Sequence, residues 1–259
     1  MLIDRLSNEP IHYELILCKP NEEQICSLKE IKNLQHEARF PTKDELTFEI
    51  PYYVLKNGQQ IKNPIYDLIK GDYLILVNRK QGDIELSSQY FIISTPKDSM
   101  NNEGDVKFIH AYSREYELNK KIIRDYSFVS RKLYSHTNEM DEDGEHLGIM
   151  NFITTLTSWS LDLPSFQNLA LDNKYRSFDV SELTLLAFLT DEIQRSFNIV
   201  FLFDTVNKKI SAKRLDDLKF TRGLYISNQN YLKSIIKEPK HDEVVTRLYC
   251  YGKDDISIN

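Results

Sequence analysis

Glycine, proline, cysteine and tryptophan are all scarce in this sequence. The 259 residues contain 8 Gly, 8 Pro, 3 Cys and 1 Trp. The cysteines, Cys18, Cys26 and Cys250, are odd in number and form no CxxC pair, which excludes a disulfide framework and a cysteine zinc site of the usual spacing. We therefore expect reduced, buried thiols.

Long hydrophobic runs are also lacking. The longest purely apolar run that we find covers residues 199–203, whereas a membrane-spanning helix needs about 20 apolar residues. Asp4, Arg5 and Glu9 interrupt the region where a secretion signal would need an unbroken apolar stretch. We expect a chain that is made in the cytoplasm, is not exported by that route and does not bind membranes.

The sequence also lacks an excess of positive charge. Lys and Arg number 33 against 39 Asp and Glu, which gives a net charge of -6. Because Lys and Arg supply most of the affinity for phosphate backbones, this balance disfavours a generic nucleic-acid-binding protein. The chain is 41% hydrophobic and 28% charged, which is typical of a folded globular protein. Its 15 Tyr and 13 Phe favour paired strands.

The first 111 residues read mainly as short strands. Apolar and polar residues alternate over 12–18 and 46–50, and denser apolar runs cover 73–77, 90–93 and 106–111. We expect a turn at 79–83 and a polar loop at 96–105. Residues 21–34 fit either a helix or a strand followed by a turn. This spacing predicts a small barrel or sandwich.

The spacing of apolar residues changes in the middle of the chain. Leu147, Met150, Ile153 and Leu156 recur three apart and predict a helix over 146–159. A second helix is expected to begin at Asp179 as N-cap, with Glu182 completing a capping-box-like pair. The apolar positions of that helix are Leu183, Leu186, Leu189, Ile193 and Phe197. A hairpin of 199–204 and 210–214 should follow, which makes an α+β unit.

The last part returns to a strand pattern at 224–227, 231–236 and 244–251. Residues 257–259 resemble the start of another strand. We expect the protein to continue beyond this sequence.

Six strings resemble the upstream domains of bacteriophage and prophage tail-hub proteins, also called tail-associated lysins or prophage tail endopeptidases. They are DELTFEIP at 44–51, SQYFIIS at 88–94, FIHAYSREYEL at 108–118, the stretch from Trp159 through YRSFDVS to 181, FLFDTVNKKI at 201–210 and VVTRLYCYGKD at 244–254. They occur in the family's order, and the resemblance covers about residues 40–259.

The resemblance implies a β-rich α+β fold like that of a phage baseplate hub. Residues 1–111 would form a β-barrel-like hub domain, 112–240 an inserted α+β domain, and 241–259 the start of a second barrel region. Three copies would close the end of the tail tube, contact the distal tail protein or tube ring, and let DNA pass without binding it specifically. The segment would be a non-enzymatic part of the virion tail, with any lytic activity located downstream.

The acidic run Glu139, Asp141, Glu142, Asp143 and Glu145, beside His136 and His146, is the most site-like cluster. Carboxylates of this kind ligate hard cations, but the spacing of the run differs from that of an EF-hand loop. We interpret the run as a solvated loop that leads into the following helix and places acids near its positive end. We assign no metal ligand and no cofactor to it.

Catalytic motifs are not evident in the sequence either. A G-x-S-x-G elbow and an HExxH motif are both missing. Cys250 shares a strand face with Val244, Thr246 and Leu248, which favours burial over reactivity. His110 is better explained by a hydrogen bond at a domain hinge than as a general base, although Glu115 and Glu117 are near in sequence. We therefore assign no catalytic residue.

Two other functions stay open. A tail-associated peptidoglycan endopeptidase is the main alternative, and paired carboxylates for glycoside hydrolysis are not singled out among the many Asp and Glu residues. A carbohydrate-binding module would use exposed Tyr and Trp. Trp159, the single tryptophan, could serve an interface, but the resemblance favours a place in the core at the end of the first helix.

Arg176 and Arg247 stand inside otherwise apolar strings. A buried or interfacial arginine needs a carboxylate or carbonyl partner, so we predict that each is paired. The Arg247→Ala variant should consequently melt at a lower temperature than the parent chain in a thermal denaturation experiment. An unchanged melting temperature would contradict the pairing.

Overall fold

The computed structural model describes residues 2–3, 10–39, 43–101, 104–124, 126–137, 139–142, 144, 146–218, 250–251 and 257–258. The chain divides into two compact units, Met1–Leu218 and Lys219–Asn259. In the second unit, β19 (Cys250–Tyr251) pairs antiparallel with β20 (Ser257–Ile258). The described residues include no helix that is long and apolar enough to span a bilayer.

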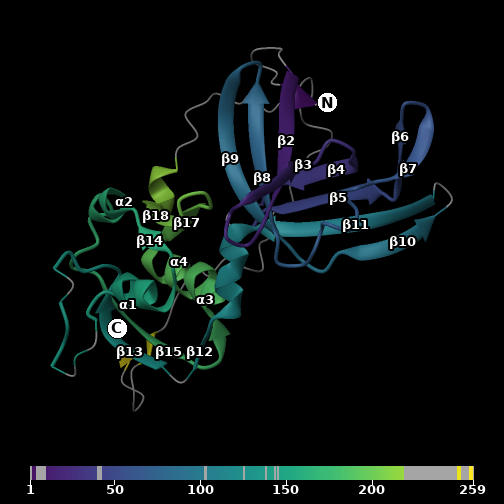
Figure 1. Ribbon diagram of the computed structural model, residues 1–259. Helices are drawn as coiled ribbons and strands as arrows, with labels where there is room; N and C mark the ends of the chain where they lie inside the picture. Colours follow the sequence, from purple (N-terminus) through teal and green to yellow (C-terminus); the bar gives the residue numbers. More distant parts are fainter. Residues whose placement is uncertain are drawn as a thin grey trace. The chain divides into compact units, whose positions relative to one another are not determined.

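The first part of the larger unit is one antiparallel sheet that curls into a half-barrel (Figure 1). The strand order is β1-β2-β8-β9-β11-β5-β4, with β3 paired to β2 and β10 paired to β11. The bounds are β1 (Leu2–Ile3), β2 (Pro10–Cys18), β3 (Gln24–Ser27), β4 (Lys32–Glu37), β5 (Glu45–Pro51), β8 (Leu74–Gln81), β9 (Ile84–Ile93), β10 (Lys97–Asn101) and β11 (Gly104–Ser113). The predicted β-rich, barrel-like fold is confirmed in this form.

Alternation of side chains builds the core of the sheet. In β5, Leu46, Phe48 and Ile50 are buried while the residues between them are half-buried. Side chains from neighbouring strands, including Leu17 of β2 and Phe91 of β9, complete the same cluster. Full burial of such a side chain contributes about 1.5–3 kcal/mol, so the two-residue period of the sequence determines which face of each strand packs inward.

Two expectations for this part are corrected or resolved. Residues 96–105 are not one polar loop, because Lys97–Asn101 forms β10 and pairs with β11 in the register Lys97↔Phe108. The described residues of β10 are exposed at the sheet edge, so this strand needs no apolar alternation and its sequence resembles a loop. Residues 21–34 contain a strand and the start of another, not a helix.

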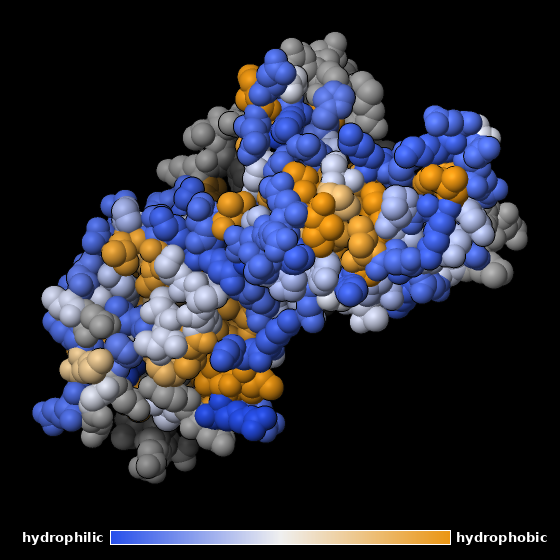
Figure 2. Space-filling model, viewed as in Figure 1, coloured by the Kyte–Doolittle hydropathy of each residue, from blue (hydrophilic) through white to orange (hydrophobic). Residues whose placement is uncertain are grey.

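A separate hairpin extends from the sheet. It consists of β6 (Tyr53–Lys56) and β7 (Gln59–Lys62), joined by Asn57 and Gly58, which both have positive φ. Two turn residues with positive φ give the turn a twist that matches the right-handed twist of the two strands it joins. The side chain of Leu55 is 80% exposed and that of Tyr53 is 50% exposed. Figure 2 shows that hydrophobic residues on the visible face lie in several patches among hydrophilic ones.

The second part of the larger unit mixes short helices and strands. A 3-10 helix, η1 (Arg114–Lys120), follows β11 directly. The other elements are β12 (Ile122–Ile123), β13 (Tyr126–Lys132), α1 (Ile149–Leu156), β14 (Ser160–Leu161), α2 (Leu163–Gln167), β15 (Tyr175–Val180), β16 (Leu183–Thr184), α3 (Leu185–Ala187), the π-helical η2 (Phe188–Ile193), α4 (Gln194–Phe197), β17 (Ile199–Asp204), β18 (Lys209–Arg214) and η3 (Leu215–Asp217). Three small sheets pair β12 with β16, β13 with β15, and β18 with both β14 and β17.

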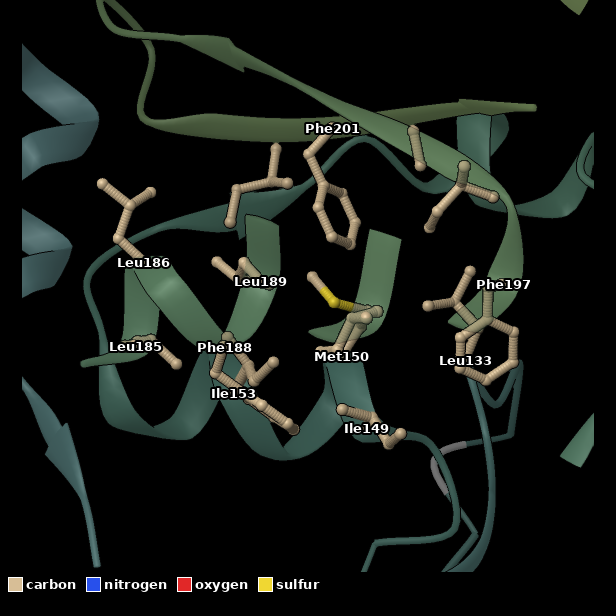
Figure 3. Packing of buried hydrophobic residues seen from close by; sticks show 14 of the residues in the cluster. Leu133, Ile149, Met150, Ile153, Leu185, Leu186, Phe188, Leu189, Phe197 and Phe201 are labelled. Atoms are coloured by element: carbon tan, nitrogen blue, oxygen red, sulfur yellow. The ribbon is translucent and has the colours of Figure 1, made fainter. Parts of the chain in front are cut away.

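This α+β part has its own hydrophobic core, which Figure 3 shows from close by. Met150 and Ile153 of α1 face Leu189 of the helical run, and Phe201 of β17 extends toward them from the strand above. All four side chains are almost fully buried. The predicted hairpin is confirmed as β17 and β18, which pair from Ile199↔Arg214 to Asp204↔Lys209.

The helix predicted to begin at Asp179 begins later. Asp179 lies in β15 and pairs with Ser127 of β13, and Glu182 has φ +53°, outside the helical region. The N-cap is Thr184, whose Oγ1 accepts a hydrogen bond from Ala187 N at 3.2 Å. Strand pairing of 175–180 therefore overrides the capping-box pattern. The first helix is also shorter than predicted, since α1 begins after Gly148 and ends at Leu156.

Gln194 joins the helical run to the adjacent sheet. This side chain is buried, its Nε2 donates to Thr190 O at 2.9 Å, and its Oε1 accepts from Phe201 N at 2.7 Å. It thereby hydrogen-bonds to one backbone group of the π-helical turn and to one backbone group of β17. The side chain of Gln194 consequently links η2 to β17.

Candidate functional site: the buried junction

The junction between the sheet and the α+β part is built from charged residues. Arg114 and Glu115 follow the last residue of β11 and are only 3% and 6% exposed. Arg and Glu side chains are almost never fully buried unless they are paired or hydrogen-bonded. Two such side chains next to each other, at the point where the chain leaves the sheet, therefore mark a built polar site.

Arg114 contacts both parts of the unit. Its Nη1 donates to Thr205 O at 3.2 Å, in the turn between β17 and β18, and its Nη2 donates to Glu22 Oε1 at 2.6 Å, beside β3. The guanidinium also lies over the ring of Tyr90, 5.2 Å from its centroid. A planar guanidinium suits such a multiple role because it presents five donors and an apolar face.

Backbone hydrogen bonding strengthens the same contact. Tyr90 N in β9 donates to Thr205 Oγ1 at 2.8 Å, and the Thr205 side chain is buried. The next residue, Val206, packs against a small cluster on the sheet that contains Cys18, Leu74 and Tyr90. The β17–β18 turn is therefore anchored to the sheet by polar and apolar contacts together.

Glu117 forms the second half of the junction. Its Oε1 accepts from Trp159 Nε1 at 2.6 Å and lies 2.9 Å from Lys208 Nζ. Trp159 is buried and meets Phe203 edge to face, with 5.8 Å between ring centroids. The expected core position of Trp159 is confirmed, and the indole N–H finds a charged acceptor, as a buried tryptophan requires.

Replacing Trp159 with Phe should lower the free energy of unfolding by about 2 kcal/mol. The smaller ring removes the donor to Glu117 and leaves a cavity beside Phe203. Urea denaturation followed by circular dichroism would measure this loss. A variant as stable as the parent chain would show that the hydrogen bond contributes nothing.

Glu115 is the second residue of η1. Its Oε1 accepts a short hydrogen bond from Ser113 Oγ, and its Oε2 is buried without a hydrogen-bond partner. Burial raises the pKa of this carboxyl from 4.5 to about 7, and the nearby Asp44 adds to the rise while Lys43 opposes it. Glu115 is therefore a group that gains or loses its proton near neutral pH.

Two cavities flank the junction. One of 570 Å³ lies between β9 and the β17–β18 turn and includes Ser87, Gln89 and Asp204 in its lining. Its carboxylates already have partners: Asp44 accepts from Gln89 Nε2 at 3.1 Å, and Asp204 accepts from backbone N–H groups of its own turn. A second cavity of 250 Å³ lies beside Glu115.

The acidic run singled out in the sequence does not converge on one point. Asp141 pairs with Arg131 at 2.6 Å, and His136 pairs with Asp172 at 3.0 Å, outside the run. Within the described ranges, no three His, Cys, Asp or Glu side chains are placed to hold a metal ion together. Asp143 and Glu145 lie outside the described residues. Arg131 is buried, so Asp141 stabilises the fold at that point.

The remaining candidates occupy structural positions. His110 Nε2 lies 3.3 Å from Glu45 Oε2 on the neighbouring strand, so its partner is neither Glu115 nor Glu117. Arg176 donates to Ser196 O at 3.0 Å and Tyr175 O at 2.7 Å. The predicted pairing of Arg176 is therefore confirmed, with the difference that its side chain is exposed.

The expectation for the thiols holds in part. Cys18 is buried and Cys26 is half-buried, and both are free. Arg247 and the side chain of Cys250 lie outside the described residues, so the predictions about them stay predictions.

Sequence reasoning missed the junction itself. The signal was present in the string SREYEL, where charged residues follow a buried strand without an intervening turn residue. What the sequence could not supply were the partners, because Glu22, Thr205 and Trp159 are between 42 and 92 positions away along the chain.

Comparisons with known proteins give one family match and one curated relative. Residues 17–110 match the family described as the YOMG N-terminal domain. The SPbeta prophage-derived uncharacterized protein YomG of Bacillus subtilis (strain 168) is 29% identical over 245 residues, which cover 95% of this chain and 25% of the relative. The chain thus spans about a quarter of that protein's length. The similarity to prophage proteins predicted from the sequence is confirmed.

Three solved structures are also similar. Prophage tail protein gp18 from Listeria monocytogenes EGD-e has a TM-score of 0.47 at 10% identity, with 79% of this chain and 51% of that chain covered. The 43 kDa tail protein of prophage MuSo2 from Shewanella oneidensis has a TM-score of 0.43 at 11% identity, with 78% and 54% covered. The Francisella PdpA-VgrG complex has a TM-score of 0.41 at 15% identity, with 87% and 30% covered.

Proposed function

We propose that this chain is a structural, non-enzymatic segment of a phage or prophage tail tip. The proposal rests on the contacts that two buried arginines make with other parts of the described chain. Arg114 holds the sheet to the α+β part, and Arg131 pairs with Asp141 within the α+β part. Removing one partner of a buried ion pair is strongly destabilising, and contacts of this kind suit a scaffold that must keep its shape in an assembly. The prophage relative supplies the setting.

The assembly that we propose is a trimer at the end of the tail tube, in contact with the distal tail protein or tube ring. Exposed apolar side chains support protein–protein contacts, since Leu55, Ile84 and Val129 are each more than 60% exposed on different strands. Residues 1–111 would be the hub domain, 112–240 the inserted domain and 241–259 the start of a second barrel. A net charge of -6 suits a channel through which DNA passes without being held.

An in-frame deletion of the coding region for this chain, in a host strain that carries the intact prophage, tests the proposal. After induction, electron microscopy should show particles without complete tails, and infectivity should fall to background. Complementation with the parent sequence should restore both. Normal tails in the deletion strain would contradict a structural role.

Incubation of the purified chain with isolated cell wall tests the enzyme alternative separately. The proposal predicts no release of soluble muropeptides above the level of a heat-denatured sample. Release that depends on the folded chain would favour a tail-associated peptidoglycan endopeptidase instead.

A further inference from the structure

We propose that Asn57 is a site of spontaneous covalent modification, at which the side-chain amide is lost and aspartate or isoaspartate forms. The turn between β6 and β7 holds this reaction back while the hairpin is closed. The inference is independent of the tail role proposed above. It rests on the residue that follows Asn57, on the exposure of the turn and on the backbone conformation of the turn.

The residue that follows Asn57 leaves the side chain open to attack. Asn57 and Gly58 form the single Asn-Gly pair of the sequence, and both residues are exposed. The backbone nitrogen of Gly58 is the nucleophile for the carbonyl carbon of the Asn57 side chain. Glycine has no Cβ to hinder that approach. A methyl group at the Gly58 Cα would meet no other described atom within 4 Å, its chain neighbours apart, so the surroundings also leave the approach open.

The reaction needs only the chain and water. The Gly58 nitrogen loses its proton and bonds to the carbonyl carbon of the Asn57 side chain. The bond from that carbon to the side-chain nitrogen breaks, the nitrogen leaves as ammonia, and a five-membered succinimide ring remains. Water then opens the ring at one of its two carbonyl groups, which gives aspartate or isoaspartate. Isoaspartate lengthens the main chain by one carbon, so it no longer fits a two-residue turn.

The closed turn keeps the two reacting atoms apart. Asn57 has φ +53° and Gly58 has φ +78°, as expected for a two-residue hairpin turn. In this left-handed conformation the Gly58 nitrogen lies nearly opposite the Asn57 side chain about the Cα–C bond. Ring closure needs both on the same side of that bond. The reaction rate therefore depends on the fraction of chains in which the hairpin is open.

The hairpin has few contacts that oppose its opening. β6 and β7 form a two-stranded sheet and pair with no other described strand, and Figure 1 shows them standing out from the curled sheet. An isolated hairpin of this kind is marginally stable in water. Val54 and Ile61 are directly paired and half-buried, whereas the other paired residues of the hairpin are exposed. Open chains are therefore populated enough for the reaction to proceed.

Two other asparagines serve as controls within the same chain. Asn33 and Asn198 also have left-handed backbone conformations, with φ +52° and +56°, and both are exposed. Leu34 and Ile199 follow them, so a bulky side chain shields the attacking nitrogen at each site. Their side-chain amides also donate to carboxylates, at 3.0 and 3.3 Å. Both should react much more slowly than Asn57.

Incubation of the full chain at pH 8, followed by peptide mapping with tandem mass spectrometry, tests the proposal. Asn57 should lose its amide about tenfold or more faster than Asn33 or Asn198, because glycine leaves the nitrogen unshielded. In urea that unfolds the chain, the rate at Asn57 should rise about threefold or more, since every hairpin is then open.

Two variants of β7 test the role of the turn. Ile61→Pro removes the N–H and the side chain of the residue opposite Val54, without changing Asn57 or Gly58. Asn57 should then react in buffer as fast as it does in urea. Gln60→Ala, at an exposed position of the same strand, should react at the parent rate. The rate at Asn33 should be the same in both variants as in the parent chain, because the curled sheet stays folded.

Two results would overturn the proposal. One is a rate at Asn57 no higher than the rates at Asn33 and Asn198, which would show that the Asn-Gly pair is not a modification site. The other is an Ile61→Pro variant that reacts at the parent rate, which would show that the closed turn does not restrain the reaction.

Discussion

Arg114→Ala is expected to lower the free energy of unfolding by about 3 kcal/mol and the melting temperature by roughly 6–12 °C. The substitution removes the donors to Thr205 O and Glu22 and the cation over Tyr90 in one step. Glu117 also loses a positive neighbour, since Arg114 Nε lies 3.9 Å from its Oε2. Differential scanning fluorimetry and urea denaturation would measure the loss.

Arg176→Ala is the matched control for that experiment. Arg176 also donates two hydrogen bonds to carbonyl groups, but its side chain is exposed, so we expect a loss of about 1 kcal/mol or less. If the two variants lost the same stability, burial of Arg114 would not be what makes the junction strong.

Glu115→Gln is expected to make the chain more stable than the parent at pH 8 by about 3 kcal/mol, and equally stable near pH 4.5. Burial raises the pKa of Glu115 from 4.5 to about 7, so the folded state holds the proton more tightly than the unfolded state. The stabilisation from this proton is complete below pH 4.5 and is lost as the pH rises to about 7. Glutamine stays neutral throughout and avoids the loss.

Urea denaturation of both proteins at pH 4.5 and pH 8 would measure this difference. Glu30→Gln, at an exposed position in the loop between β3 and β4, controls for the removal of one negative charge and should change stability little at either pH. Identical pH profiles for the parent chain and Glu115→Gln would contradict a proton held by the folded state.

Local patterns in the sequence predicted elements well where burial alternates. The two-residue period at Leu46, Phe48 and Ile50 identified β5, and the run after Asn198 identified the β17–β18 hairpin. Prediction failed where pairing depends on distant residues. The sequence around Asp179 resembles a helix N-cap, but Asp179 instead lies in β15. The partner of β15 is β13, which begins some fifty residues earlier in the chain.

The candidate site was less accessible to sequence reasoning than the fold. The residue type alone does not show whether a charged side chain is buried or exposed. In the sequence, Arg114 is therefore indistinguishable from the many other charged residues of this chain. Arg176, which stands in an apolar string, was the more conspicuous of the two and proved to be exposed. Burial at the junction results from contacts between segments far apart in sequence, which no short motif encodes.

Immunogold labelling of intact particles tests the central claim most directly. Antibodies raised against this chain should label purified, induced phage particles at the tail tip, and mass spectrometry of the same particles should recover its peptides. Unlabelled tails, together with peptides found only in the soluble fraction of lysed cells, would contradict the assignment of this chain to the tail.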